Sequence, residues 1–197
     1  MIKNMTTFTT RRYSRQGLWS LFLVCAFPLH FWTLILVFRD ISWLTERTNA
    51  WDAIGVASYG MLFALTESVV IFLFVALLGL LTPKHWQIDR RIAFLTLLIL
   101  IASIWGMISQ LLFLWNISLP APAVQFLRSS SHPLRILYVA SLTIVTTTVL
   151  LPVYSFIRSD KAVPFMQNLA ERLSVLTMFY LLFDLLGLII VIIRNFG

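Results

Sequence analysis

Two acidic residues lie inside long apolar runs of the sequence, where ionisable side chains are rare. Glu67 is the only charged residue between positions 53 and 81, and Asp184 is the only one between positions 173 and 193. His30 lies in a third apolar run. Such residues can share a hydrogen bond, hold a proton or line a solute pathway. They are therefore the first candidates for a functional site.

These three side chains are expected to meet at one depth. Glu67 and Asp184 each lie near the middle of their runs, and His30 lies slightly beyond the middle of its own. No Lys or Arg lies at this depth, so His30 is the only available cation and at least one carboxyl group should be protonated at neutral pH. The predicted polar cluster, or proton or ligand pathway, consists of Glu67, Asp184, His30, Gln110 and Tyr180.

The same residues also have a purely structural interpretation, as hydrogen-bonding contacts between helices. A single intramembrane histidine is more often a packing residue than a ligand. On a helix, Glu67 falls on the side of the small residues Ala53, Ala57, Gly60 and Ala64, where a second helix can approach closely. We therefore expect Glu67 to face another helix.

Composition indicates the elements that carry these residues. Of the 197 residues, 59% are hydrophobic and 12% are charged, and the mean hydropathy is +0.89. Soluble proteins have about 45 to 50% apolar and 25% charged residues. The sequence predicts an all-α polytopic membrane protein, a bundle of five transmembrane helices. Residues 1–16 are expected to form a polar cytoplasmic tail and residues 17–197 a single transmembrane domain, with spans at 17–38, 53–81, 92–115, 136–157 and 173–193.

Polar residues recur at helical spacing on two of these spans. The third span should bury one such face, because Gln110 in lipid would leave an amide without a hydrogen bond. That face carries Thr96, Ser103, Gly106 and Gln110, and the matching face of the fifth span carries Thr177, Tyr180, Asp184 and Gly187. Residues 39–50 and 116–136 are predicted to be connecting segments, and Pro28 to kink the first span.

The net charge of +7 is explained by membrane topology. Ten of the fifteen Lys and Arg residues fall in the segments that are cytoplasmic if the N-terminus is inside, and five in the outer ones. This favours a cytoplasmic N-terminus and an outer C-terminus, in the plasma membrane. No basic patch is interleaved with stacking aromatic residues, so nucleic acid is not an expected partner.

Three functions remain open. The favoured one is a non-enzymatic accessory or scaffolding subunit, held in the lipid bilayer, that binds a larger membrane protein. The alternative is a proton or small-solute carrier that uses Glu67 and Asp184.

The third hypothesis is a membrane-embedded enzyme acting on a lipid-linked substrate. It would need interfacial residues such as Asp52, His85, Asp89 and His132, but no catalytic motif accompanies them. Cys25 is the only cysteine, so no intrachain disulfide or thiolate pair can form. No cofactor, metal or catalytic residue is expected.

Overall fold

A computed structural model describes residues 13–115 and 117–196, and these residues form helices and no β-strand. Five of the helices are long and apolar enough to cross a membrane. The elements in chain order are α2 (Arg15–Arg47), α3 (Ala50–Leu78), the 3₁₀ turn η1 (Gly79–Leu81), α4 (Ile88–Leu114), α5 (Ala121–Ser129), α6 (Pro133–Arg158) and α7 (Ala162–Phe196). The short helix α5 joins α4 to α6. Most of the predicted tail, residues 1–12, lies outside the described residues.

Each long helix begins before its predicted span, and α2, α6 and α7 also end after theirs. Most of this added length replaces predicted loops. Residues 39–47 continue α2, so that only Thr48 and Asn49 separate it from α3. This segment contains neither Pro nor Gly, and the helix ends where the backbone N–H and the hydroxyl of Thr48 both donate to the carbonyl of Leu44. Asn49 then caps α3 by accepting a hydrogen bond from the backbone N–H of Asp52, 2.9 Å away.

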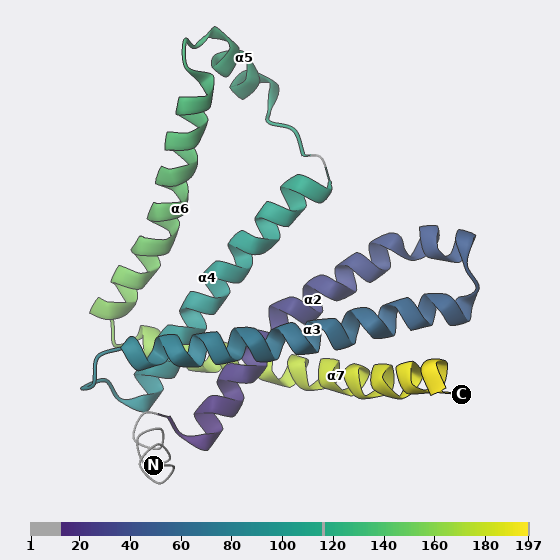
Figure 1. Cartoon of the computed structure of the whole chain (residues 1–197). Helices are drawn as coiled ribbons and strands as arrows, with labels where there is room; N and C mark the ends of the chain where they lie inside the picture. The colour runs from purple at the N-terminus through teal and green to yellow at the C-terminus, as the bar shows by residue number, and fades with distance from the viewer. Residues whose placement is uncertain (1–12, 116, 197) are drawn as a thin grey trace.

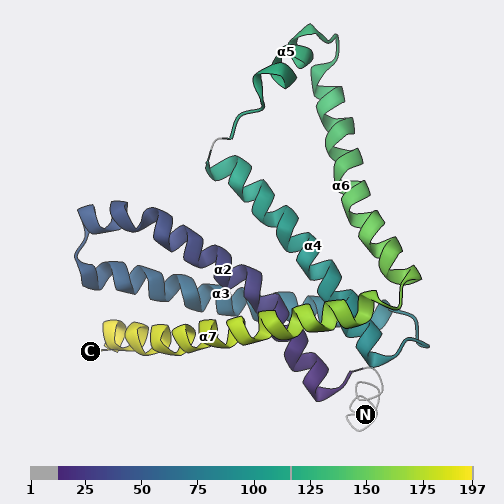
Figure 2. The ribbon, with the colours of Figure 1, turned by 180° about the vertical axis from the view of Figure 1, so that it is seen from behind.

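Three helices form the main body of the protein. Helices α2, α3 and α7 run side by side and make the most extensive contacts in the structure (Figure 1). Helix α2 changes direction along its length in both views (Figures 1 and 2), and Pro28 lies inside it. This bend agrees with the predicted effect of a proline that removes a helical hydrogen bond.

Helices α4 and α6 leave this body at an angle, with α5 at their far end (Figures 1 and 2). The first half of α4 is buried, whereas Phe156 is the only buried residue of α6. The hydroxyls of Thr143 and Thr148 donate to carbonyls one turn earlier in α6, at 2.8 and 2.7 Å. These two threonines therefore satisfy their hydroxyl groups within α6, and most of the helix surface is left without a protein partner.

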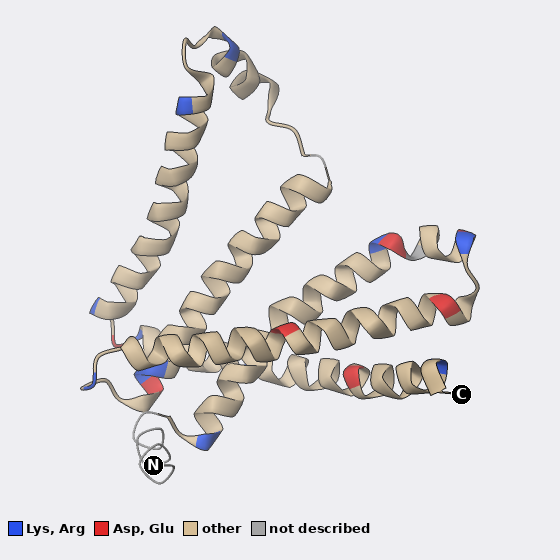
Figure 3. Cartoon of the chain, viewed as in Figure 1, with Lys and Arg blue, Asp and Glu red and all other residues tan. Residues whose placement is uncertain are grey.

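A cluster of buried hydrophobic residues lies where α4 begins and α3 ends. The phenol of Tyr13 donates to the carbonyl of Ala76 at 2.7 Å, and Leu21, Val24 and Leu95 pack in the same cluster. Charged residues gather mainly near helix ends, and long stretches of α4 and α6 carry none (Figure 3). This distribution is typical of helices whose middle parts lie in hydrocarbon.

Arg91, near the start of α4, is a buried basic residue and is 2% exposed. Its Nε donates to the hydroxyl of Thr82 at 2.7 Å, and an Nη donates to the carbonyl of Pro83 at 3.3 Å. The side chain therefore satisfies polar groups at the end of η1.

Candidate functional site

A buried contact between two ionisable side chains joins α2 to α7. The Nε2 atom of His30 lies 2.9 Å from a carboxylate oxygen of Asp184, and the two residues are 0% and 3% exposed. The other ring nitrogen, Nδ1, lies 2.8 Å from the carbonyl of Ala26. Two of the five residues predicted to cluster therefore form a direct contact, although they are 154 positions apart in the chain.

The proton positions of this pair follow from hydrogen-bond chemistry. A carbonyl can only accept, so Nδ1 of His30 carries a hydrogen. Nε2 then either accepts from a protonated Asp184 or, in the imidazolium, donates to the carboxylate. In both arrangements the contact holds one shared proton and the pair has no net charge, which is the least costly state away from water.

Packing closes the space around the pair. The ring of Tyr180 is stacked on the ring of His30, with centroids 6.0 Å apart and an interplanar angle of 6°. One turn before Tyr180 on α7, the hydroxyl of Thr177 lies 3.0 Å from the carbonyl of Leu23 on α2 and 2.8 Å from that of Leu173.

Gly187 of α7 is also buried, and a Cβ on it would lie 3.3 Å from the backbone oxygen of Ser58 on α3. The face of α7 that the spacing predicts is therefore the face that packs against α2 and α3.

One acceptor of the pair is unsatisfied. The second carboxylate oxygen of Asp184 is buried and has no hydrogen-bond partner among the described residues. A buried acceptor without a partner is costly, so this oxygen offsets part of the stabilisation that the contact with His30 provides.

Glu67 does not join this pair. Its side chain is exposed on α3, and the described residues give it no hydrogen-bond or ion-pair partner. The expectation that the two acids turn toward each other is therefore wrong. The buried face of α3 instead carries Gly55, Ser58, Met61, Ala64, Ser68 and Val75, so Glu67 is next to Ser68 in the chain but about 100° away around the helix.

Gln110 is also exposed, contrary to the prediction for its face. The face is buried at Thr96, half-buried at Ser103 and exposed at Gly106 and Gln110. Helix α6 contacts α4 too sparsely to cover this end of the face. Gln110 lines a shallow surface pocket of about 360 Å³ together with Ser109, Leu112 and Phe113.

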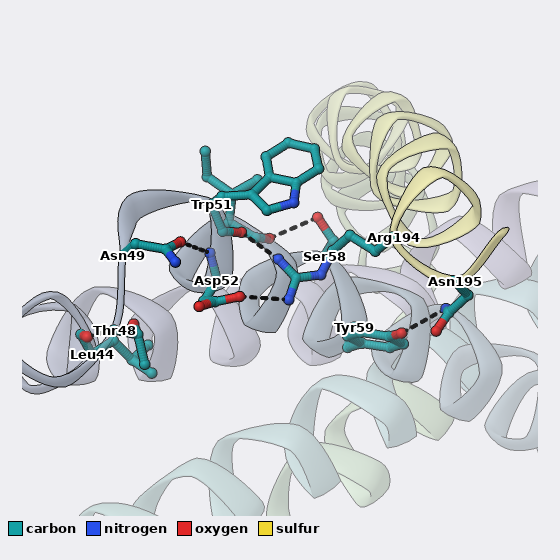
Figure 4. Close-up of polar contacts among 10 residues, drawn as sticks. Leu44, Thr48, Asn49, Trp51, Asp52, Ser58, Tyr59, Arg194 and Asn195 are labelled. Carbon is teal, nitrogen blue, oxygen red and sulfur yellow. Dashed lines mark hydrogen bonds and ion pairs between the residues drawn. The ribbon is translucent and has the colours of Figure 1, made fainter. Parts of the chain in front are cut away.

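Asp52, a candidate for the enzyme hypothesis, is occupied in an ion pair (Figure 4). Arg194 near the end of α7 donates to the carboxylate of Asp52 at 2.7 Å and to the carbonyl of Trp51 at 2.6 Å. The side-chain amide of Asn195 donates to the hydroxyl of Tyr59 at 2.7 Å. These contacts connect the end of α7 to the start of α3, and nothing in the sequence indicated that Arg194 and Asp52 would pair.

The remaining enzyme candidates do not form one site. His85 and Asp89 line a pocket at the start of α4, while exposed His132 directly precedes α6, beyond α5 and on the far side of α4. Among the described residues, no group of three or more His, Cys, Asp or Glu side chains is arranged to hold a metal ion.

Fold and site together define an all-helical protein with five helices of membrane-spanning length and composition, joined internally by a buried histidine–aspartate pair. Comparisons with protein-family models, with curated proteins and with solved structures find no match.

Proposed function

We propose that this chain is a non-enzymatic integral membrane subunit that binds a larger membrane protein through the exposed face of α3. In this proposal the five long helices cross the plasma membrane, with the N-terminus in the cytoplasm and the C-terminus outside. The excess of Lys and Arg on one side of the predicted topology supports this orientation.

The exposure of Glu67 is the observation that carries the proposal. Near the middle of a membrane helix, an acid that faces lipid has a high free-energy cost. Such residues normally pair with another polar group inside a bundle. Because the described residues offer Glu67 no partner, a side chain from another protein is the natural source of one.

The surface around Glu67 has the form of a helix-packing seam. On this side of the helix, exposed residues recur at spacings of three or four positions, which places them along one face. Phe63 and Val70, on either side of Glu67, are 66% and 60% exposed. The α3 seam, as we define it, consists of seven residues of α3 and the last residue of η1: Val56, Tyr59, Phe63, Glu67, Val70, Phe74, Leu77 and Leu81.

The chemistry of the seam defines the partner. A single transmembrane helix of the partner would pack along the apolar residues and place a hydrogen-bond donor opposite Glu67. Lys, Arg or His would donate to a carboxylate, and an interhelical hydrogen bond of this kind helps to hold membrane helices together. An accessory subunit needs no catalytic group for this function.

Site-specific photo-crosslinking tests the proposal in membranes of the native host. A photoreactive amino acid at Phe63 or Val70 should crosslink to one membrane protein, whereas the same probe at Leu142, exposed on α6, should not. Glu67→Ala should reduce the crosslink about tenfold or more. Glu67→Gln should retain it, because an amide can still form a hydrogen bond.

Crosslinks to lipid alone, or crosslinks that are unchanged by Glu67→Ala, would reject the proposal. Crosslinking to a second copy of this chain would replace the larger partner by self-association.

The proton carrier is the second candidate, and the shared proton between His30 and Asp184 favours it. Transport would require this buried pair to become accessible in turn from each side of the membrane. Asp184→Asn should then abolish proton-linked transport in reconstituted vesicles while the protein remains folded. If the subunit hypothesis is correct, the same variant should leave crosslinking at Phe63 intact.

A further inference from the structure

A pocket of about 730 Å³ opens where α4 and α7 begin and α6 ends. One wall is formed by residues 85–90 and the other by residues between 157 and 167. In the proposed topology this end of the molecule lies at the cytoplasmic surface of the membrane. The pocket is therefore placed at the level of lipid headgroups.

Arg90 is held between the two walls. One Nη donates to the carboxylate of Asp160 at 3.0 Å, and the other donates to the carbonyl of Ile157 at 2.8 Å. The guanidinium also lies over the ring of Trp86, 5.5 Å from its centroid. These contacts fix the cation, while 27% of the side chain remains exposed.

The guanidinium retains hydrogen-bonding capacity. It carries five N–H groups, and the described residues accept from only two of them. Nε is buried, so a ligand in the pocket would be bound by the remaining N–H groups of the two Nη atoms. An anionic oxygen in the pocket would accept from them, and charge-assisted hydrogen bonds of this kind are the bonds that arginine forms with phosphate.

The backbone of α4 adds to this preference. Helix α4 begins at Ile88, and its N-cap residue Gln87 makes no capping hydrogen bond through its side chain. The N–H groups of the first turn therefore remain available at the positive end of the helix. Gln87, Asp89 and Arg90 all line the pocket, so this helix end forms part of its wall.

The charges that line the pocket favour a ligand that carries both signs. Arg90 provides one positive charge, and Asp89 and Asp160 provide two negative charges. Asp160 is paired with Arg90, whereas the exposed carboxylate of Asp89 has no partner among the described residues. A simple anion would be repelled by Asp89, but a ligand with a phosphate and an ammonium group satisfies both.

We propose that this pocket binds the phosphoethanolamine headgroup of a membrane phospholipid, with the phosphate on Arg90 and the ammonium on Asp89. This assignment rests on the proposed membrane topology, which places the pocket in the headgroup layer. The lipid would connect the start of α4 to the segment between α6 and α7. No covalent step is involved.

Native mass spectrometry of the full chain in detergent provides the test. Dioleoyl phosphatidylethanolamine, phosphatidylglycerol and phosphatidylcholine are added in equal amounts, and the retained lipid is measured. The chain should retain phosphatidylethanolamine at least about fivefold more than either of the others. Arg90→Gln should lower this retention about tenfold, and the matched control Arg128→Gln, an exposed arginine of α5, should not.

A second variant keeps the test valid if Arg90→Gln fails to fold. Asp89→Asn removes an exposed side chain with no partner among the described residues, and it should lower the preference for phosphatidylethanolamine over phosphatidylglycerol. Equal retention of the three lipids, or equal effects of Arg90→Gln and Arg128→Gln, would overturn the proposal. Retention of soluble phosphoethanolamine without the lipid would show that the ligand is not a phospholipid.

The two proposals can fail separately. An intact crosslink at Phe63 together with unselective lipid retention rejects the lipid site alone. Loss of the crosslink at Phe63 together with selective retention of phosphatidylethanolamine rejects the partner protein and leaves the lipid site in place.

Discussion

The contact between His30 and Asp184 leads to the most quantitative prediction. Replacing either residue by Leu leaves the other buried without its partner. The side chains of the pair are 0% and 4% exposed, so water cannot replace the lost hydrogen bond. Breaking a buried pair from one side costs about 3 to 5 kcal/mol, and each single variant should lose about 3 kcal/mol of unfolding free energy.

The double variant should lose far less than the sum of the two single losses. When both partners are apolar, no buried donor or acceptor is left unpaired across the contact. We therefore expect His30→Leu with Asp184→Leu to lose about 3 kcal/mol rather than about 6, a coupling energy of about 3 kcal/mol. Asp184→Asn should lose only about 1 kcal/mol, because its amide can donate to Nε2 of His30.

Equilibrium unfolding in mixed micelles, with increasing sodium dodecyl sulfate and helicity followed by circular dichroism, measures these differences. Glu171→Leu is a suitable control, because Glu171 is an exposed acid of α7, and it should change stability by less than about 0.5 kcal/mol. If the two leucine variants are additive, the pair contributes no mutual stabilisation. Additive losses would refute the predicted coupling between His30 and Asp184.

Three further predictions follow from the packing of α7 and from the topology. Arg194→Ala should lower stability by only about 1 kcal/mol or less, measured in the same unfolding assay, because its ion pair is partly exposed; a loss above about 3 kcal/mol would contradict this. Gly187→Val should separate α7 from α3 and lower the free energy of unfolding by about 1 to 3 kcal/mol. The control Gly106→Val, at a position with no atom within 4 Å of an added Cβ, should lower it by less than about 1 kcal/mol. Equal losses would contradict close packing at Gly187. A cysteine at Lys84 should be protected from a membrane-impermeant maleimide in intact cells and a cysteine at Ser131 should be labelled; the reverse pattern would invert the proposed orientation.

The apolar runs were sufficient to predict five helices of membrane-spanning length, because length and composition alone limit what such segments can form. The boundaries were less well predicted. Residues 39–47 are polar but contain no helix-breaking residue, so α2 continues through them. Polarity indicates where a helix leaves an apolar environment, and it does not indicate where the helix ends.

Whether the side chain of Glu67 faces the interior or the surface could not be predicted, because α3 is apolar on nearly every side. In such a helix periodicity does not identify the packed face. The small residues Ala57 and Gly60 favoured one face, but the packed face is centred on neighbouring positions such as Ser58 and Ser68. This difference in the orientation of α3 about its own axis is enough to move Glu67 from the interior to the surface.

The α2–α7 contact was easier to anticipate, because Thr177, Asp184 and Gly187 lie on one face of an otherwise apolar helix. The sequence by itself determined the helices and the polar face of α7, since both depend on composition and spacing along a single segment. Only the tertiary structure decided that His30 meets Asp184, that Glu67 and Gln110 face outward, and that Arg90 and Asp89 line one pocket. Each of these depends on the rotation and tilt of one helix against another, and these are determined by contacts between residues far apart in the chain.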